Sequence, residues 1–439
     1  MRQITFSPYN KTLTNCNVWT QDGNRIVFDV RSDREGSAFD GTRIESINVE
    51  TGETEVLYRS FNGACCGVAT CSQADDRIVC IHGPENPTAD WHYGPTRRWG
   101  TILHSNGKTE TLDGCQLASP FVPGSLRGGS HVHVFSGDGT WISFTYQDEL
   151  LRWWDENRPL EPHDPDQRNV GVSVPITPAP ICLHHPRNHT GTHFSVLVSR
   201  TVAKPQPGSD EIEKAYEDAW VGTNGYVKPN GKCQKKAIAF LGDLVSSNGK
   251  KFTEVFLVDL PDDPAEMQRE GDGPLAGTET RRPLPPKNVT QKRLTFTETR
   301  KFPGIQGPRH WVRSSPDGSQ IAFLFRGDHG IVQLGSVSPN GGEITAITNN
   351  PWSVESAFTW SPDGRSIAYV MNRSVFLTTG IGETKQRTIR LTPQAKNADD
   401  TPLPLAVVFS PDGQRIAFQK NVLHENGKRY NQIFYTAGG

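Results

Sequence analysis

The sequence contains no long hydrophobic run. Its 439 residues include no apolar stretch of about 18 residues, which is the least that a membrane-spanning helix needs. The amino-terminal segment MRQITFSPYN has no basic stretch followed by an apolar core, so no secretion signal is visible. These absences predict a cytoplasmic protein that has no membrane partner.

Charge of one sign is not in excess either. Lys and Arg together number 46, Asp and Glu 48, and the formal net charge is -2. Such a chain has no overall positive field to attract nucleic acid, so we expect no nucleic-acid partner.

Motifs of several common chemistries are missing. The eight cysteines form no C-x-x-C pair of the kind that binds structural zinc, and a large chain without a secretion signal is expected to keep its thiols reduced. The G-x-S-x-G elbow of α/β-hydrolases is absent, and so is the phosphate-binding loop G-x-x-x-x-G-K-[S/T].

A strand–turn–strand repeat runs through the chain instead. Each regular copy places S/T-x-D-G between two apolar segments, and this makes a tight turn in which Gly is free to take positive φ. The regular copies are 17–28, 133–144, 312–323, 358–369 and 407–418, and the less regular ones are 67–80 and 192–199. Seven units predict an all-β fold, a single seven-bladed β-propeller domain over residues 1–439. An open sandwich or two domains are the alternatives.

The ends of the chain and the fourth unit add detail to this prediction. Residues 2–6 resemble an outer strand and are expected to close the ring beside 432–435. The fourth unit carries insertions near 203–235 and 263–290. Within the first, Ser209–Trp220 begins with a capping serine followed by acidic residues, which predicts a short helix.

Four histidines fall at the starts of predicted inner strands, which line the central channel of a propeller. His131 and His133 are two apart on one strand, so we expect them to face the same side. His193 and His310 occupy corresponding positions in the next two units. Neutral imidazoles suit Zn, Mn, Fe, Ni or Cu, so His131, His133, His310 and His193 are the predicted metal ligands. A polar channel lining without metal is the alternative.

Arginines accompany these histidines. Arg127, Arg187 and Arg309 each lie within a few residues of one of them. Guanidinium groups bind carboxylates and phosphates through two parallel hydrogen bonds, so we expect an anionic ligand. Arg313 is expected to form a structural ion pair with Asp or Glu instead.

A second cluster lies in the second unit. It contains His82, Arg97 and Arg98, and its aromatic side chains Trp91, Tyr93 and Trp99 could stack on a sugar ring. A packed loop without a ligand is the alternative. The predicted substrate-binding residues are Arg187, His82, Trp91, His92 and Arg98.

Two resemblances follow from these motifs. The S-P-D-G repeats resemble those of TolB-type and WD40-like propellers. The string R-x-x-S-H-x-H at 127–133 resembles oligogalacturonate lyase, a seven-bladed propeller. That likeness implies a divalent metal, usually manganese, with a histidine as base and an arginine on the uronate. The chain departs from it at Gly128, where that family has a glutamine ligand, and in carrying the motif in the third unit.

Longer strings resemble the YidR-like bacterial propeller proteins. They are H-G-P-E-N-P at 82–87, L-R-G-G-S-H-V-H-V-F-S at 126–136, P-Q-P-G-S-D-E-I at 205–212 and R-H-W-V-R at 309–313. This resemblance extends over nearly the whole chain and implies the propeller fold.

The combined prediction is a metal-dependent lyase that cleaves a small acidic, uronate-containing saccharide by β-elimination. The metal is expected to be Mn or Zn. His193, Arg127 and Arg309 are the predicted catalytic residues, with His193 as base or fourth ligand. The alternatives are a non-catalytic TolB-like scaffold for a protein or peptide, and a metal-dependent sugar hydrolase or isomerase that uses the same site.

Overall fold

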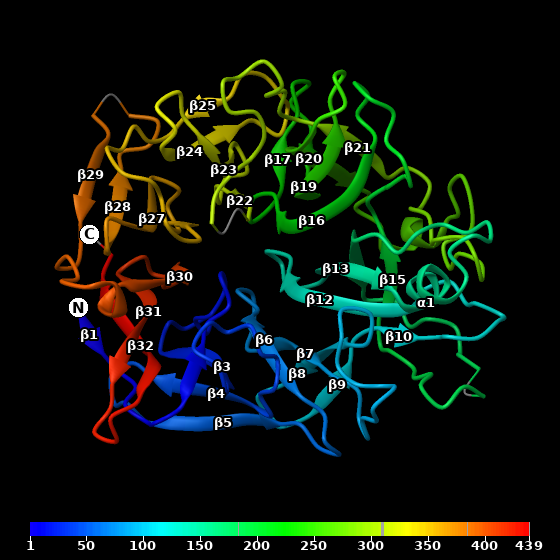
Figure 1. Ribbon diagram of the computed structural model, residues 1–439, viewed down its shortest axis with the longest axis horizontal. Coiled ribbons are helices and arrows are strands. Elements are labelled where there is room, and N and C mark those ends of the chain that lie inside the picture. Colours follow the sequence, from blue (N-terminus) through cyan, green and yellow to red (C-terminus); the bar gives the residue numbers. More distant parts are fainter. Residues whose placement is uncertain (183, 309–310, 384, 439) are drawn as a thin grey trace.

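A computed structural model of the protein shows seven four-stranded antiparallel sheets arranged as blades around a central axis (Figure 1). It describes residues 1–182, 184–308, 311–383 and 385–438. The blades follow one another in chain order, so the colours of Figure 1 run around the ring from blue to red. The predicted seven-bladed β-propeller is confirmed. No helix of the described ranges is long and apolar enough to cross a bilayer.

The blades are numbered along the chain, and their strands are given from the inner to the outer one. Blade 1 consists of β2 (Asn10–Thr12), β3 (Arg25–Arg31), β4 (Arg43–Asn48) and β5 (Thr54–Arg59). Blade 2 consists of β6 (Cys66–Cys71), β7 (Ile78–His82), β8 (Trp99–Leu103) and β9 (Thr109–Thr111). Blade 3 consists of β12 (Gly128–Phe135), β13 (Ile142–Asp148), β14 (Asn169–Val174) and β15 (Phe194–Leu197). Blade 4 consists of β16 (Ile212–Trp220), β19 (Lys236–Val245), β20 (Lys251–Leu260) and β21 (Thr290–Arg293).

The remaining blades complete the ring. Blade 5 consists of β22 (Arg313–Ser314), β23 (Ile321–Arg326), β24 (Val332–Val337) and β25 (Thr345–Ala346). Blade 6 consists of β26 (Thr359–Trp360), β27 (Ser366–Met371), β28 (Ser374–Thr379) and β29 (Arg387–Arg390). Blade 7 consists of β30 (Pro402–Phe409), β31 (Arg415–Leu423), β32 (Arg429–Ala437) and β1 (Arg2–Gln3).

Smaller elements lie in the connections. β10 (Gly114–Cys115) pairs in parallel with β11 (Ser125–Leu126), and β17 (Tyr226–Val227) pairs with β18 (Cys233–Gln234). The helices are α1 (Glu149–Asn157) and the 3-10 turns η1 (Pro264–Gln268) and η2 (Ala398–Asp400).

The regular repeat copies fold as their turn chemistry predicts. In all five, the Ser or Thr hydroxyl donates to the Asp carboxylate two residues later, over 2.5–2.6 Å. The Gly that follows has a φ of 68–72°, a conformation that side chains other than glycine rarely adopt. These turns join the inner strand of a blade to its second strand.

The core lies between the blades. Seven clusters of buried apolar side chains each combine residues of two neighbouring blades, and together they cover every interface around the ring. The cluster between blades 7 and 1 contains Ile4, Trp19 and Ile433. Burial of this kind, rather than contact within one sheet, fixes the ring.

The amino-terminal strand closes the ring, as predicted. Arg2 lies opposite Tyr435 and Gln3 opposite Phe434, so β1 becomes the outer strand of blade 7. The prediction for the fourth unit was wrong in two places. Residues 192–199 contain β15, the outer strand of blade 3, rather than an inner strand. The predicted helix Ser209–Trp220 contains β16, the inner strand of blade 4.

Register shifts explain the second error. β16 is interrupted twice, between Ile212 and Lys214 and between Tyr216 and Ala219, so its apolar residues do not alternate as in a regular strand. The α-helix of the described ranges is α1, which begins at Glu149 after the second strand of blade 3. Asp148 caps it by accepting from the backbone N–H groups of Leu150 and Leu151.

Candidate functional site

The inner strand of blade 3 contains a β-bulge that sets the direction of its histidines. β12 pairs regularly with β13 as far as His131 and shifts register directly afterwards. Val132 takes a φ of 52°, which is unusual for a β-branched residue, and Val68 on the inner strand of blade 2 has a φ of 55°. A bulge re-aims the side chains beside it. The expectation that His131 and His133 face the same side was therefore wrong.

His131 lies in the wall of a cavity on the propeller axis, with a volume of about 360 Å³. We call it the central cavity. Residues from blades 1, 2, 3 and 7, and Trp311 just before blade 5, line it. Its polar lining consists of Thr12, Thr14, Asn15, Arg31, Ser37, Tyr93, Arg98 and His131.

Arg98 brings an unpaired positive charge to the central cavity. Only 7% of the residue is exposed. Its Nη1 donates to the hydroxyl oxygen of Tyr93 over 2.9 Å, while its Nε is buried without a partner. No described carboxylate forms an ion pair with it, and burial lowers its pKa. A buried cation without a counter-charge costs several kcal/mol, which an anionic ligand would offset.

Arg168 is a second unpaired guanidinium near His131. Together with His131 and Trp311 it lines a small adjoining cavity of about 20 Å³. Its Nη2 donates to the side-chain oxygen of Gln147 over 3.1 Å, and it has no ion pair with a carboxylate in the described ranges. Two arginines thus approach one histidine, and the acidic residues Glu217 and Asp218 line the same small cavity as Arg168.

These charges keep His131 neutral. Burial, followed by the charges of Arg98 and Arg168, holds the pKa of His131 well below its ordinary value. Arg31 contributes less and is already paired with Asp29 over 2.7 Å. Neither ring nitrogen of His131 is hydrogen-bonded to a described residue. The imidazole can therefore accept a proton from a ligand in the central cavity.

Unsatisfied hydroxyl groups lie in the same cavity wall. The Oγ1 atoms of Thr12 and Thr14 are buried and have no hydrogen-bond partner. Buried polar groups nearly always have one, so this wall lacks a polar partner that a hydroxylated ligand or water would supply.

His133 lies inside the protein, between blades 2 and 3. Its Nε2 is 2.9 Å from the hydroxyl oxygen of Ser130, which also donates to both carboxylate oxygens of Asp113. Burial lowers the pKa of His133 to about 3 and raises that of Asp113 to about 7. Gly100 leaves the space that the His133 ring fills. His133 belongs to the packing of the two blades and does not reach the central cavity.

The predicted metal ligands do not come together in the described part of the chain. His310, like Arg309, lies outside the described residues. His193 precedes the outer strand β15, where its Nδ1 is 2.9 Å from the hydroxyl of Thr192. Burial lowers the pKa of His193 to about 4, although the negative charge of Glu110 on blade 2 acts to raise it. The described ranges contain no group of three His, Cys, Asp or Glu side chains arranged to hold a metal ion.

Arg127 is fully buried in an ion pair. Its guanidinium has no exposed surface and donates to Asp148, with Nη2 2.6 Å from Oδ2. It also contacts the carbonyl oxygen of Thr278 and lies over the ring of Phe121. In this arrangement Arg127 joins blade 3 to the long connection of blade 4 and is not accessible to a ligand.

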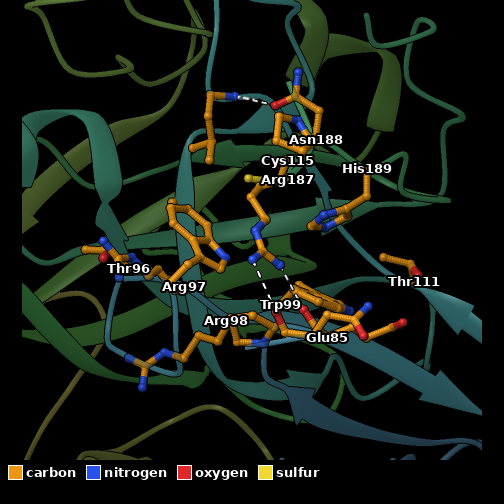
Figure 2. A pocket seen from close by; sticks show the side chains of 16 residues that line it. Glu85, Thr96, Arg97, Arg98, Trp99, Thr111, Cys115, Arg187, Asn188 and His189 are labelled. Carbon is orange, nitrogen blue, oxygen red and sulfur yellow. Dashed lines mark hydrogen bonds between the residues drawn. The ribbon is translucent and has the colours of Figure 1, made fainter. Parts of the chain in front are cut away.

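A second cavity, of about 300 Å³, lies at the rim of blades 2 and 3 (Figure 2). We call it the rim pocket. The loop between β7 and β8 and the segment before β15 form its walls, and Arg98 belongs to the walls of both cavities. Arg187 lies in the middle of the pocket and donates to the backbone oxygens of Glu85 and Asn86, over 2.8 and 3.3 Å.

The aromatic rings of this region are already covered by protein. The guanidinium carbons of Arg97 and Arg187 lie 4.4 and 5.5 Å from the centre of the Trp91 ring. Trp99 packs against His82 and His189, with ring centres 5.0 and 4.6 Å apart. The Tyr93 ring stacks on Phe39 at 4.2 Å. These rings hold the loops together, and Trp91 and Trp99 also line the rim pocket.

The remaining predicted residues line neither the central cavity nor the rim pocket. His82 is 2% exposed, and its Nδ1 is 2.7 Å from the carbonyl oxygen of Gly83. His92 is exposed and its Nδ1 lies 3.0 Å from the carbonyl oxygen of Ala89. The expected ion pair of Arg313 is absent from the described ranges, because Arg313 donates to Asn15 and to its neighbour's carbonyl.

Several cavity residues were not predicted. Thr12 and Thr14 belong to the start of blade 1, where the register of the repeat places inner-strand residues, so the turn at 20–23 could have located them. Trp311 precedes the turn of blade 5 in the same way. Arg31 and Arg168 lie beyond the inner strands, at the end of β3 and just before β14. No sequence signal points to these two.

The fold and the central cavity define the class of protein: a seven-bladed β-propeller with unpaired cationic side chains on its axis. The chain belongs to the family of YidR, a protein of Escherichia coli (strain K12) described as uncharacterized, with which it shares 46% identity over 422 residues, 96% of this chain and 95% of the relative. Residues 65–189 match the family model described as "Protein of unknown function (DUF3748)".

Solved propellers are similar in fold. Oligogalacturonate lyase in complex with manganese has a TM-score of 0.52 at 12% identity, covering 99% of this chain and 92% of that chain. TolB from Acinetobacter baumannii has a TM-score of 0.34 at 13% identity, covering 95% and 80%. The first of these likenesses supports the propeller architecture.

Proposed function

We propose that the protein is a lyase that binds a small acidic saccharide of the uronate type in the central cavity and cleaves it by β-elimination. The unpaired guanidinium of Arg98 carries the proposal, because a buried cation in a cavity wall favours an anionic ligand. Arg168 adds a second cation, and the hydroxyls of Thr12 and Thr14 would bind sugar hydroxyls.

The chemistry follows from the neutral state of His131. A proton on the carbon beside a carboxylate is weakly acidic, and nearby cations lower the energy of the enolate that forms when it is removed. His131 would accept this proton. The electron pair then forms a carbon–carbon double bond while the bond to the glycosidic oxygen breaks, and the leaving oxygen takes a proton from water.

Substrate binding would also strengthen this base. The charges of Arg98 and Arg168 contribute to the low pKa of His131 in the free protein. A bound carboxylate offsets these charges, so the pKa of His131 rises when the acidic ligand is present, while burial, the largest cause of its low pKa, continues to lower it. The base is thereby activated by the substrate that it acts on.

No step is assigned to a metal. The manganese of the solved oligogalacturonate lyase belongs to that protein, and the described donor side chains of this chain do not form a metal centre. A bound Mn or Zn ion remains a prediction from the sequence, and His310 is one of its predicted ligands.

Calorimetric titration with D-galacturonate tests the binding site. The wild type is expected to bind D-galacturonate and to bind the neutral sugar D-galactose much more weakly. Arg98→Gln should weaken D-galacturonate binding about 10- to 100-fold, because hydrogen bonds to charged groups contribute about 1.5–3 kcal/mol. Arg200→Gln, which alters an exposed arginine paired with Asp272, is the matched control and should bind normally.

Turnover of uronate disaccharides tests the reaction. The expected product carries a double bond conjugated to the carboxylate and absorbs in the ultraviolet, and His131→Gln should abolish its formation while retaining most of the affinity. Equal affinity for the acid and the neutral sugar, or normal binding by Arg98→Gln, would refute the proposed site. Binding without an unsaturated product would refute the lyase.

A further inference from the structure

The rim pocket lies within the segment that the family model matches. All residues lining it lie between Pro84 and His189, inside the 65–189 range of the family model, although the pocket involves two blades and the loops between them. The central cavity, by contrast, draws on residues from Thr12 to Leu405. A cavity of about 300 Å³ confined to this segment is of the size that small ligands occupy.

The rim pocket carries excess positive charge. Arg97 is neutralised by Glu149, with Nη2 2.8 Å from Oε1. Arg187 has only backbone oxygens as hydrogen-bond partners and no ion pair with a described carboxylate. Glu85 contributes one carboxylate to the same wall, and Asn62, which donates to its Oε2, is uncharged. Against it, Arg98 and Arg187 supply two cations that have no ion pair with a described carboxylate. An anion beside Arg187 would therefore be favoured.

His189 adds an acceptor next to this charge. Burial lowers the pKa of His189 to about 4, against backbone hydrogen bonds to Arg187 and Asp113 that raise it. The ring is therefore neutral at pH 7. Its Nε2 is buried without a partner in the pocket wall, which is unusual for a polar atom. A ligand hydroxyl could donate to this nitrogen after a small shift of the ring.

We infer that the rim pocket is a second binding site, separate from the central cavity, for a small hydroxylated anion such as a sugar acid or a hydroxy acid. Arg187 binds the acid group and His189 accepts from a hydroxyl. The inference goes beyond the proposed function, because it concerns another site and requires no elimination chemistry. Since Arg98 belongs to both walls, the two sites are neighbours.

The stoichiometry of D-glucuronate binding, measured by calorimetry, tests this inference. Two molecules per chain are expected for the wild type and one for Arg187→Gln. Arg187→Lys keeps the charge and should retain the second site with a loss of several-fold. His189→Phe keeps a ring against Trp99 but loses the nitrogen acceptor, and it should weaken the second site several-fold.

The outcomes separate this inference from the proposed function. A single site that Arg98→Gln removes and Arg187→Gln leaves intact would overturn the rim site and support the central one. A single site that is lost in Arg187→Gln and in His189→Phe would support the rim site and overturn the central one. Thermal unfolding of each variant shows whether it is folded, and unchanged binding by both Arg187→Gln and His189→Phe refutes the inference.

Discussion

Two histidines separated by one residue have different environments in this protein. His131 is partly open to the central cavity and has no hydrogen-bond partner among the described residues, whereas His133 is completely buried against Ser130. The positive φ of Val132 turns the backbone between them. An H-x-H string therefore does not imply a chelating pair when the strand is bulged at its middle residue.

Substitution of His133 is expected to affect stability and not ligand binding. His133→Gln should lower the free energy of unfolding by about 1–3 kcal/mol, because it disturbs a buried hydrogen bond and a tightly packed ring. Urea unfolding measures this change. Affinity for D-galacturonate should stay within about twofold of the wild type, and a large loss of affinity would contradict the placement of His133.

The pH dependence of the same variant gives a second readout. The pKa of His133 is lowered to about 3 in the folded protein, so its contribution to stability is present above about pH 6.5 and is lost as the pH falls toward 3. The stability difference between wild type and His133→Gln should therefore narrow on acidification, by up to about 1.4 kcal/mol per pH unit. A constant difference from pH 7.5 to 4.5 would contradict a buried neutral imidazole.

At the scale of elements, the repeat was predictable because its turn is specified locally. Ser, Asp and Gly within four residues determine the turn, and the apolar run after it determines the second strand, as 407–418 illustrates. β16 was not predictable in this way. Its two register shifts disturb the alternation, and an insertion containing β17 and β18 replaces its turn, so no local signal remains.

The candidate site was predictable only in part, for a related reason. Inner-strand positions such as His131 follow from the repeat register. Arg98 was found because it follows a cluster of aromatic residues. Arg168 is brought close to His131 by the connection that follows α1, and it forms no ion pair in the described ranges although Glu217 and Asp218 line the same small cavity. The absence of a partner is a property of the folded chain, and no sequence pattern reports it.

Packing at the start of β12 also determines the position of the loop that carries Arg98. Gly129 has no room for a side chain, because a Cβ there would lie 2.9 Å from the carbonyl carbon of Thr96 and closer still to the backbone oxygen of Pro95. Gly129→Ala should push away the loop that carries Arg98. We expect a loss of about 1–3 kcal/mol in stability, as for other overpacked sites, and weaker D-galacturonate binding.

Gly94→Ala is a matched control for this change, since a Cβ at Gly94 meets no atom within 4 Å. It lies in the same loop and should leave both stability and affinity nearly unchanged. Normal D-galacturonate affinity in Gly129→Ala would show that the position of the loop does not govern the site.

At the scale of the whole molecule, charge is distributed unevenly. The formal net charge is -2, yet Arg98, Arg168 and Arg187 lack ion pairs within the described ranges and line the central cavity, the small cavity beside it or the rim pocket. Positive charge without ion pairs is therefore concentrated on one side of the ring of blades. Local placement of unpaired cations, and not net charge, favours an anionic ligand here.

The closure between blades 7 and 1 is the last structural feature that a single substitution can test. Ile4 is 4% exposed in the core of this interface, and its backbone N–H donates to the carbonyl oxygen of Ile433 over 3.0 Å. Ile4→Ala should reduce the free energy of unfolding by about 2–5 kcal/mol, the usual range for a buried Ile. It should also free the edge of β32 and increase self-association.

Ile367→Ala provides the comparison, because Ile367 is equally buried but lies between blades 5 and 6, away from the closure. Both variants should lose similar stability in urea unfolding. Only Ile4→Ala should also form larger species in light scattering, because only that substitution loosens a strand that covers an edge. If the two variants aggregate equally, the amino-terminal strand contributes burial alone and does not protect the ring.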